Sequence, residues 1–213
     1  MTCPAVPALD SPPPDNELAT MAAALMQSRQ TILPKRLAAP GPSASELGMI
    51  LEAAATAPDH GQLLPWRFVQ VPAATRAGLA DVFGAALVER DADATAEQVA
   101  QARAKAHRSP LLLLLIVDGL RGDTDIDLFE RVVSAGCAVQ NMLLMATALG
   151  YGSALTSGKA LKSSTLRTLF GLAEGEHALC FVSIGTAQSR KKSRMRPASG
   201  DFVTRLLPDA DPA

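Results

Sequence analysis

The stretch TAPDHGQLLPWRF, residues 56–68, lies between a segment with helical periodicity and one with the alternation of a strand. Within thirteen residues it holds two prolines, one of the three histidines and the only tryptophan of the chain. Pro58 predicts the end of the preceding helix, because the residue before a proline avoids helical backbone geometry. Trp66 and Phe68 begin the strand-like segment, and we expect both to anchor it in the core. The loop joins a helix to a strand, and its unusual composition raises the question of whether it also holds a ligand.

Length and composition place the chain among globular proteins of one domain. It has 213 residues, 48% of them hydrophobic, and a formal net charge of −1. This apolar content argues against disorder, and the balanced charge argues against a general nucleic-acid-binding protein, which is usually basic. We expect one domain over residues 16–207, a proline-rich tail at 1–15 and a short tail at 208–213. We expect no nucleic-acid partner.

No charged residue occurs from Val132 to Gly158, which is long enough to cross a bilayer. The run nevertheless contains serines, threonines and glycines together with Gln140 and Asn141. A buried helix followed by a turn and a strand explains it better than a membrane span. The N-terminus has no basic segment before an apolar one, so it does not resemble a secretory signal. We therefore expect a soluble, cytoplasmic protein with no membrane partner.

The three cysteines are far apart and show no spacing typical of metal or redox sites. Cys137 and Cys180 fall inside apolar runs, so we expect both to be buried as small hydrophobic side chains, whereas Cys3 lies in the N-terminal tail. The histidines show no metal-ligand spacing with the cysteines, and we expect no metal site.

Hydrophobic periodicity predicts helices alternating with strands. The clearest helix begins at Ser43, which forms an S-x-x-E capping box with Glu46. Its expected apolar face is made of Leu47, Ile50, Leu51 and Ala54. The apolar run PLLLLLIV (110–117) predicts a central strand covered on both faces. Further helices are expected over residues 18–28, 75–89, 95–107, 127–149 and 163–170, and further strands over 66–71, within 150–158 and over 177–186. This pattern predicts an α+β or α/β fold, a small central sheet wrapped by helices.

The helix expected over residues 127–149 is apolar on nearly every side and needs covering. A chain of this length has little left to cover it, so we expect a homodimer that shares this helix in its interface. The alternative is a central helix inside a monomer.

The sequence lacks the usual motifs of nucleophilic, metal-dependent or phosphate-loop catalysis, among them HExxH, GxSxG and GxxxxGK[ST]. GYGSALTSG (150–158) follows a helix and leads into a strand, which is the wrong order for a dinucleotide-binding fingerprint. We interpret Gly150 as the turn that ends the helix. No side chain is assigned as a covalent or acid–base catalyst.

Four polar or positively charged segments remain as candidates for binding. They are SRQTILPKR (28–36), the loop with Asp59, His60, Trp66 and Arg67, residues 155–157, and the basic segment SRKKSRMRP (189–197). Each alone has an ordinary explanation as a helix end, a core tryptophan or a solvated tail. Together they predict a site for one planar, anionic ligand, with arginines for a phosphate and hydroxyls for a polyol.

The order of these segments resembles the nitroreductase family of FMN-dependent NAD(P)H oxidoreductases, and within it the small bacterial NAD(P)H nitroreductases. The matching segments, over about residues 18–205, are SRQT, APDHGQLLPWRF, GCAVQNMLLMATALGYGS and IGTAQ before the basic tail. The resemblance implies an α+β, three-layer fold with a mixed or antiparallel central sheet wrapped by helices. It also implies a homodimer with one FMN in each of two interfacial sites.

The resemblance assigns the phosphate end of the FMN site by position. Arg29, Gln30 and Thr31 match residues that hold the phosphate and the ribityl chain, although Gln30 stands where the family has an arginine. Arg196 lies in the family's C-terminal phosphate-binding region and is a candidate to supply the missing charge. Arg194 is the competing candidate.

The resemblance also assigns the ring end. Leu155, Thr156 and Ser157 match residues beside the flavin ring, and the first two differ from the family, which bears on the substrate pocket more than on FMN binding. Thr56 and His60 match positions that reach the FMN of the partner subunit. The implied answer to the opening question is that the loop contacts a ligand bound to the other chain.

The implied function is NAD(P)H-dependent reduction of a small-molecule electron acceptor, such as a nitroaromatic or a quinone, in a ping-pong cycle. Because FMN carries the hydride and electron chemistry, no acid–base motif is needed. The alternatives are another flavin chemistry on the same fold, such as flavin destruction or reductive dehalogenation, and a non-catalytic or regulatory flavin-binding dimer. A structural module without flavin is the remaining alternative.

Overall fold

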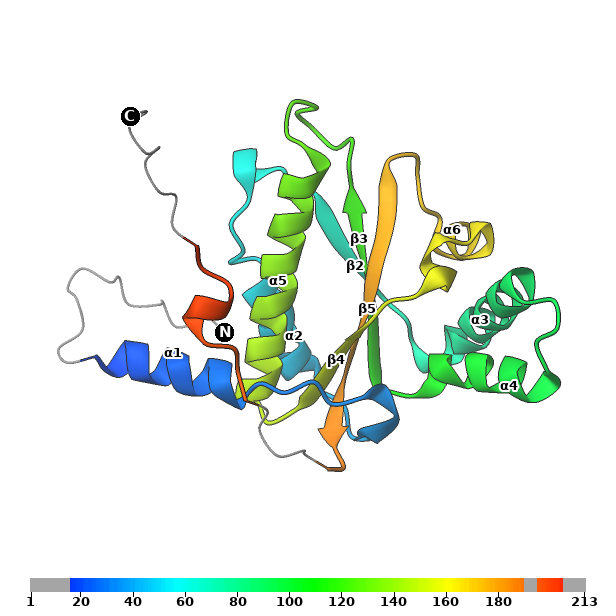
Figure 1. Ribbon diagram of the computed structural model, residues 1–213, viewed down its shortest axis with the longest axis horizontal. Helices are drawn as coiled ribbons and strands as arrows, with labels where there is room; N and C mark the ends of the chain where they lie inside the picture. The colour runs from blue at the N-terminus through cyan, green and yellow to red at the C-terminus, as the bar shows by residue number, and fades with distance from the viewer. Residues whose placement is uncertain (1–15, 190–194, 205–213) are drawn as a thin grey trace, which may run out of the picture.

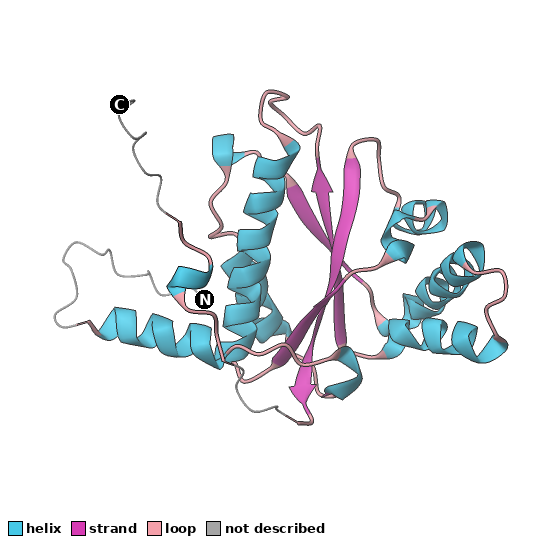
Figure 2. Ribbon diagram, in the orientation of Figure 1, coloured by secondary structure: helices cyan, strands magenta, loops and turns pink. Residues whose placement is uncertain are grey.

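A computed structural model describes residues 16–189 and 195–204 of the protein. The expectations for the tails at 1–15 and 208–213, and for Cys3 and Arg194, lie outside these residues. Within the described residues, one five-stranded sheet stands between two groups of helices (Figure 2).

The sheet is antiparallel at every strand pair. Its strands are β1 (Leu37–Ala38), β2 (Trp66–Gln70), β3 (Leu111–Asp118), β4 (Gly152–Thr156) and β5 (Glu176–Ala187). The order is β1-β5-β3-β2, and β4 also pairs with β5. Seven of the eight residues of β3 are buried, so the central strand covered on both faces is confirmed.

The helices form a layer on each side of the sheet (Figure 1). On one side lie α1 (Glu17–Ser28), α2 (Ala44–Ala54) and α5 (Leu128–Ala148), and on the other lie α3 (Arg76–Arg90), α4 (Ala96–Ala104) and α6 (Ser164–Phe170). Short 3-10 turns occur at Pro34–Arg36, His60–Gln62, Ala73–Thr75, Lys105–His107, Lys159–Lys162 and Ser199–Asp201. The α+β, three-layer architecture with an antiparallel sheet is therefore confirmed.

Local sequence signals determine where several helices begin and end. The capping box at Ser43 and Glu46 is formed in both directions and starts α2. A second capping box, from Thr95 and Gln98, starts α4. Gly150 follows α5 with a φ of 87°, a backbone conformation that residues with a side chain rarely adopt. The predicted turn at Gly150 is confirmed.

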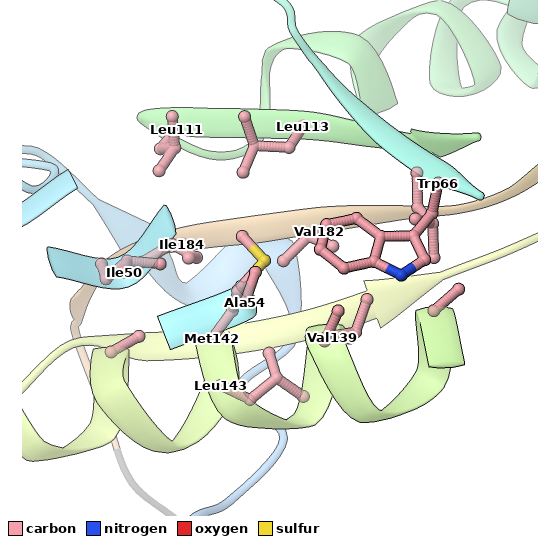
Figure 3. Close-up of a cluster of buried hydrophobic side chains, with 14 of the residues drawn as sticks. Ile50, Ala54, Trp66, Leu111, Leu113, Val139, Met142, Leu143, Val182 and Ile184 are labelled. Carbon is pink, nitrogen blue, oxygen red and sulfur yellow. The ribbon is translucent and has the colours of Figure 1, made fainter. Parts of the chain in front are cut away.

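The main hydrophobic core lies between the sheet and the layer of α2 and α5. Figure 3 shows Trp66 of β2 among side chains of β3, β5, α2 and α5. The indole Nε1 of Trp66 donates a hydrogen bond to Oγ of Ser134, 3.0 Å away, so its polar atom is satisfied. Phe68 packs against the same cluster, and the anchoring of this strand is confirmed. A second cluster on the opposite face lies beneath α3 and α6.

Burial is lower than expected at Leu51 and at the two cysteines, and α1 is unusual in a different way. Helix α1 forms as predicted but buries none of its residues within the chain, because it lies at the side of the molecule and faces little of it (Figure 1). Leu51, expected on the buried face of α2, is 39% exposed. Cys137 and Cys180 are only partly buried. Burial nevertheless raises the pKa of the Cys180 thiol to about 11, which keeps it protonated and unreactive at neutral pH.

Helix α5 is covered on one side only. Its buried residues face α2 and the sheet, whereas Phe129 and Val133 are 77% and 64% exposed. In the part of the chain that the structure describes, no helix is both long enough and apolar enough to cross a membrane.

Arg67, the arginine of the PWRF motif, connects two strands of the sheet through an ion pair. Arg67 donates two hydrogen bonds to the carboxylate of Glu176, with Nε–Oε1 and Nη2–Oε2 distances of 2.7 and 2.9 Å. The guanidinium lowers the pKa of Glu176 below its usual range. This pair links the ends of β2 and β5 across β3.

Replacement of Arg67 by methionine is expected to destabilise the protein by about 2 kcal/mol, because a buried carboxylate loses a bidentate partner. Thermal unfolding at pH 7 then shows a midpoint roughly 4–8 °C below that of the wild type. Because the folded-state pKa of Glu176 is lowered, the pair stabilises the fold above the ordinary glutamate range and ceases to do so as the pH falls through the lowered value. The difference in midpoint therefore shrinks at acidic pH.

Arg103→Met is the matched control, since it breaks an ion pair with Asp81 in which both side chains are exposed. A loss of stability as large in this control as in Arg67→Met, or no loss in Arg67→Met at pH 7, would contradict the role assigned to the Arg67–Glu176 pair.

Candidate functional site

A cavity of about 270 Å³ lies where the end of α1, the middle of α5 and strand β4 meet. It is lined by Arg29, Thr31, Gln140, Leu143, Ser153, Ala154 and Leu155. Three of the nine residues expected to bind a cofactor, Arg29, Thr31 and Leu155, are therefore brought together although they are far apart in sequence. Gln140 and Ser153 were not predicted, because nothing in the local pattern distinguishes them from ordinary helix and strand residues.

Backbone pairing brings the segment after α1 against β4. Thr31 and Ser153 form a parallel β-bridge, and the N–H of Ile32 donates to the carbonyl of Ser153 at 2.9 Å. Gly152 permits this close approach, since a Cβ atom there would lie 2.9 Å from Leu37 Cδ2 and 3.0 Å from Ile32 Cγ1. The lining of the cavity is thus held by the sheet.

Two buried polar atoms at this junction have no hydrogen-bond partner among the described residues. They are Oγ of Ser153, in a residue only 2% exposed, and Oε1 of Gln30. A buried polar atom without a partner costs about 1–3 kcal/mol, so such atoms are rare unless something else satisfies them. Ser153 lines the cavity, and a ligand with hydroxyl or phosphate groups would supply the missing hydrogen bond.

Positive charge is available at the same end of α1. Arg29 lines the cavity, and its guanidinium forms no hydrogen bond or ion pair with another described residue. Nη2 of Arg196 donates to the backbone carbonyl of Arg29 at 3.0 Å, and so connects the C-terminal arm (residues 195–204) to the site. Figure 1 draws the arm on the same side of the sheet as α1 and α5. Two arginines at one place are suited to a phosphate dianion.

A second cavity, of about 730 Å³, begins where β4 ends. Thr156, Ser157 and Gly158 line it, and they follow directly on Leu155 of the smaller cavity. Its other walls come from α3, α4, β5 and the 3-10 turns at residues 34–36, 105–107 and 159–162. The three residues predicted beside a flavin ring thus divide between two neighbouring cavities.

The larger cavity has a cationic lining that sequence analysis did not assign. Lys35, Arg90, Lys105, Arg108 and Lys159 line it, against one carboxylate, Asp91. Lys35 belongs to SRQTILPKR, one of the four candidate segments, whereas Arg90, Lys105, Arg108 and Lys159 lie outside those segments. Only the tertiary arrangement of α3, α4 and β4 gathers them.

Within the described chain, neither cavity is lined by a histidine or a cysteine, and Asp91 is the only acidic residue in either lining. These linings provide no paired nucleophile and base. They provide guanidinium and ammonium groups, hydroxyls and apolar walls, which is a donor set for binding and orienting a bound cofactor and its substrate.

Thr56, Asp59 and His60, in the loop at residues 56–68, line neither cavity. Oγ1 of Thr56 accepts a hydrogen bond from Nδ2 of Asn141 at 2.9 Å, and Nδ1 of His60 is 2.8 Å from Oε2 of Glu130. Both contacts are therefore with α5, and neither loop residue lines the two cavities. Asp59 accepts a hydrogen bond from the N–H of Leu64 and so shapes the loop.

Comparison with known proteins agrees with this architecture. The sequence model of the Nitroreductase family matches residues 26–186. A protein of Haemophilus influenzae named "Putative NAD(P)H nitroreductase" is 34% identical over 173 residues, which cover 81% of this chain and 93% of that protein.

Two solved structures have the same fold. A nitroreductase-like family protein from Bacillus cereus superposes with a TM-score of 0.73 at 17% identity, covering 86% of this chain and 95% of that one. A nitroreductase from Bacteroides fragilis, solved with bound FMN, superposes with a TM-score of 0.65 at 19% identity and covers 87% and 98%.

Proposed function

The chain belongs to the nitroreductase family, as the match over residues 26–186 shows, and on this premise we propose that it is an FMN-dependent NAD(P)H oxidoreductase. The observation that carries the proposal is the smaller cavity, which Arg29, Thr31 and Ser153 line together, with the buried hydroxyl of Ser153 lacking a partner among the described residues. The related protein from Haemophilus influenzae is named for NAD(P)H, and the structural relative from Bacteroides fragilis binds FMN.

The residues present fit this cofactor. Arg29 and Arg196 would hold the phosphate, and Thr31 and Ser153 would hydrogen-bond the ribityl hydroxyls. Gln30, with its buried and unpartnered Oε1, retains a polar group where the family has an arginine. When bound, FMN supplies the redox chemistry, taking a hydride equivalent from NAD(P)H and then reducing a nitroaromatic or quinone acceptor in a ping-pong cycle.

At the other end, Leu155, Thr156 and Ser157 would lie against the flavin ring. Leu155 offers an apolar wall, and the two hydroxyl residues offer hydrogen bonds at the start of the larger cavity. The function of these side chains is to orient the ring and its substrate, and no proton transfer is assigned to them.

We further propose that the site is completed by a second copy of the chain. Val133, Gly136 and Gln140 share the exposed side of α5, and Gln140 lines the smaller cavity. Figure 1 draws α1, α5 and the C-terminal arm on this same side of the molecule, and all three carry exposed apolar side chains: Leu18, Met21, Met26, Phe129, Val133, Met195, Phe202 and Val203. A surface this apolar is typical of an interface.

In such a homodimer, the loop at residues 56–68 would sit at the interface, because Thr56 and His60 contact α5. We propose that Thr56 and His60 of the partner subunit face the FMN bound to the first chain.

The proposal is tested with the purified protein. Bound FMN gives a yellow protein whose flavin is released on heating, and NADH or NADPH bleaches the colour under argon until a nitroaromatic or quinone restores it. A protein that FMN titration does not change in colour or stability refutes the proposal. Bound FMN that neither nucleotide reduces supports a flavin-binding protein without this activity.

Arg29→Ala is expected to raise the FMN dissociation constant about ten-fold, because a charged phosphate contact is lost, and Ser153→Ala about five-fold. Fluorescence titration measures both constants. The thermal midpoint of the FMN-free protein distinguishes lost binding from a damaged fold. Ser153→Ala should leave this midpoint unchanged or raise it, because the substitution removes an unpartnered buried hydroxyl.

Ser134→Ala is the matched control for Ser153→Ala. Its hydroxyl is equally buried but accepts the Trp66 hydrogen bond, so this variant should lower the FMN-free midpoint and leave the FMN affinity unaltered. If Ser153→Ala instead lowers the midpoint and leaves the affinity unchanged, Ser153 has only a structural role.

Val133→Glu is expected to convert the dimer to a monomer, since it places a carboxylate on an apolar interface, and the monomer should lose FMN. Light scattering and the flavin-to-protein absorbance ratio measure the two effects. Val88→Glu, on the opposite layer of helices and 47% exposed, is the control and should remain dimeric. A monomer that retains full FMN occupancy would rule out a shared site.

A further inference from the structure

The larger cavity combines an apolar floor with a cationic rim. The floor consists of buried or half-buried side chains, namely Phe83, Ala86, Leu87, Ala102, Leu161 and Phe181. The rim consists of Lys35, Arg90, Lys105, Arg108 and Lys159, which are exposed or, for Arg108, half-buried. A planar ring suits the floor and an anionic substituent suits the rim.

No carboxylate of residues 16–189 and 195–204 forms an ion pair with a rim cation. Among the described residues, the ion pairs are His60–Glu130, Arg67–Glu176 and Arg103–Asp81, and none involves a rim residue. Asp91 is the one carboxylate in the lining, against five cations. In a chain whose overall charge is −1, this excess of positive charge is a local feature. A cleft of one sign raises the local concentration of ligands of the opposite sign.

The position of the cavity connects it to the proposed reaction. Its lining includes Thr156 and Ser157, which the preceding proposal assigns to the flavin ring. A substrate bound on the apolar floor would therefore be next to the cofactor. Its volume of about 730 Å³ is ample for an aromatic ring with substituents.

We propose that this cavity is the acceptor site and that it selects aromatic acceptors bearing a carboxylate or a comparable anionic group. The inference rests on the proposed oxidoreductase function and names its substrate class. For a nitroaromatic acid, the two-electron reduction of the nitro group to a nitroso group consumes a hydride equivalent from NAD(P)H and a proton, and releases water. The rim cations orient the acid group and take no part in this redox step.

The test compares 4-nitrobenzoate with the neutral 4-nitrobenzamide as acceptors for the FMN-loaded protein. Arg90→Gln combined with Lys105→Gln removes two rim charges. The ratio of kcat/KM for the benzoate to that for the benzamide is expected to fall about ten-fold, as for the loss of two partly screened charge contacts. Raising the salt concentration should lower the wild-type ratio in the same direction.

Arg103→Gln is the control. It removes one positive charge from α4, two residues before Lys105, but Arg103 is paired with Asp81 and does not line the cavity. Its acceptor ratio should equal that of the wild type. A ratio that is unchanged in the rim variant, or changed equally in the control, overturns the proposal.

Two further measurements separate the possible failures. Isothermal titration of 4-nitrobenzoate into the FMN-loaded protein should show weaker binding to the rim variant than to the wild type. Equal binding to both proteins overturns the acceptor site, even if turnover is absent. The KM for NAD(P)H, measured at saturating 4-nitrobenzamide, should be the same in the rim variant and the wild type. If this KM rises in the rim variant while the benzoate-to-benzamide ratio does not fall, the rim binds the phosphates of the reductant, and the proposal is wrong. Absence of NAD(P)H oxidation with either acceptor contradicts the proposed function itself.

Discussion

Strand β3 is the constraint on which the rest of the structure depends. Its run of leucine, isoleucine and valine is buried on both faces, so a layer of helices is required on each side of the sheet. One layer contains α2 and α5 and the other contains α3 and α6. Once both faces are covered, the ligand-accessible space is at the edge where β4 ends. Both cavities are found there.

The sheet positions the lining of the smaller cavity, the proposed binding site. The bridge between Thr31 and Ser153 holds the end of α1 against β4, and in doing so it buries a hydroxyl that no described residue satisfies. In the proposed site, bound FMN would satisfy this atom, which is otherwise unfavourable to the stability of the chain. On this proposal Ser153 contributes to ligand affinity, whereas Ser134, which accepts a hydrogen bond from Trp66, contributes to the stability of the fold.

Much of the fold follows from the sequence because its signals are local. The capping box at Ser43, the continuous apolar run of β3 and the turn at Gly150 each specify their element directly. Burial was harder to predict, because it depends on neighbours: α1 has an apolar periodicity and yet buries nothing within one chain. The resemblance placed Arg29, Thr31 and Leu155 in one site, and the cavity contains all three. Periodicity alone does not reveal that Arg67 pairs with Glu176, or that Arg90 and Lys105 share a cavity with Lys35, because these arrangements arise from strand register and helix packing.

A crystal structure of the protein with FMN is the most direct test of the central claim. We predict a dimer with the phosphate against Arg29 and Arg196, the hydroxyl of Ser153 within hydrogen-bonding distance of the ribityl chain, and the ring beside residues 155–157. Thr56 and His60 of the partner subunit should border the same site. FMN bound elsewhere, or within a single chain with Ser153 still unpartnered, would contradict the account.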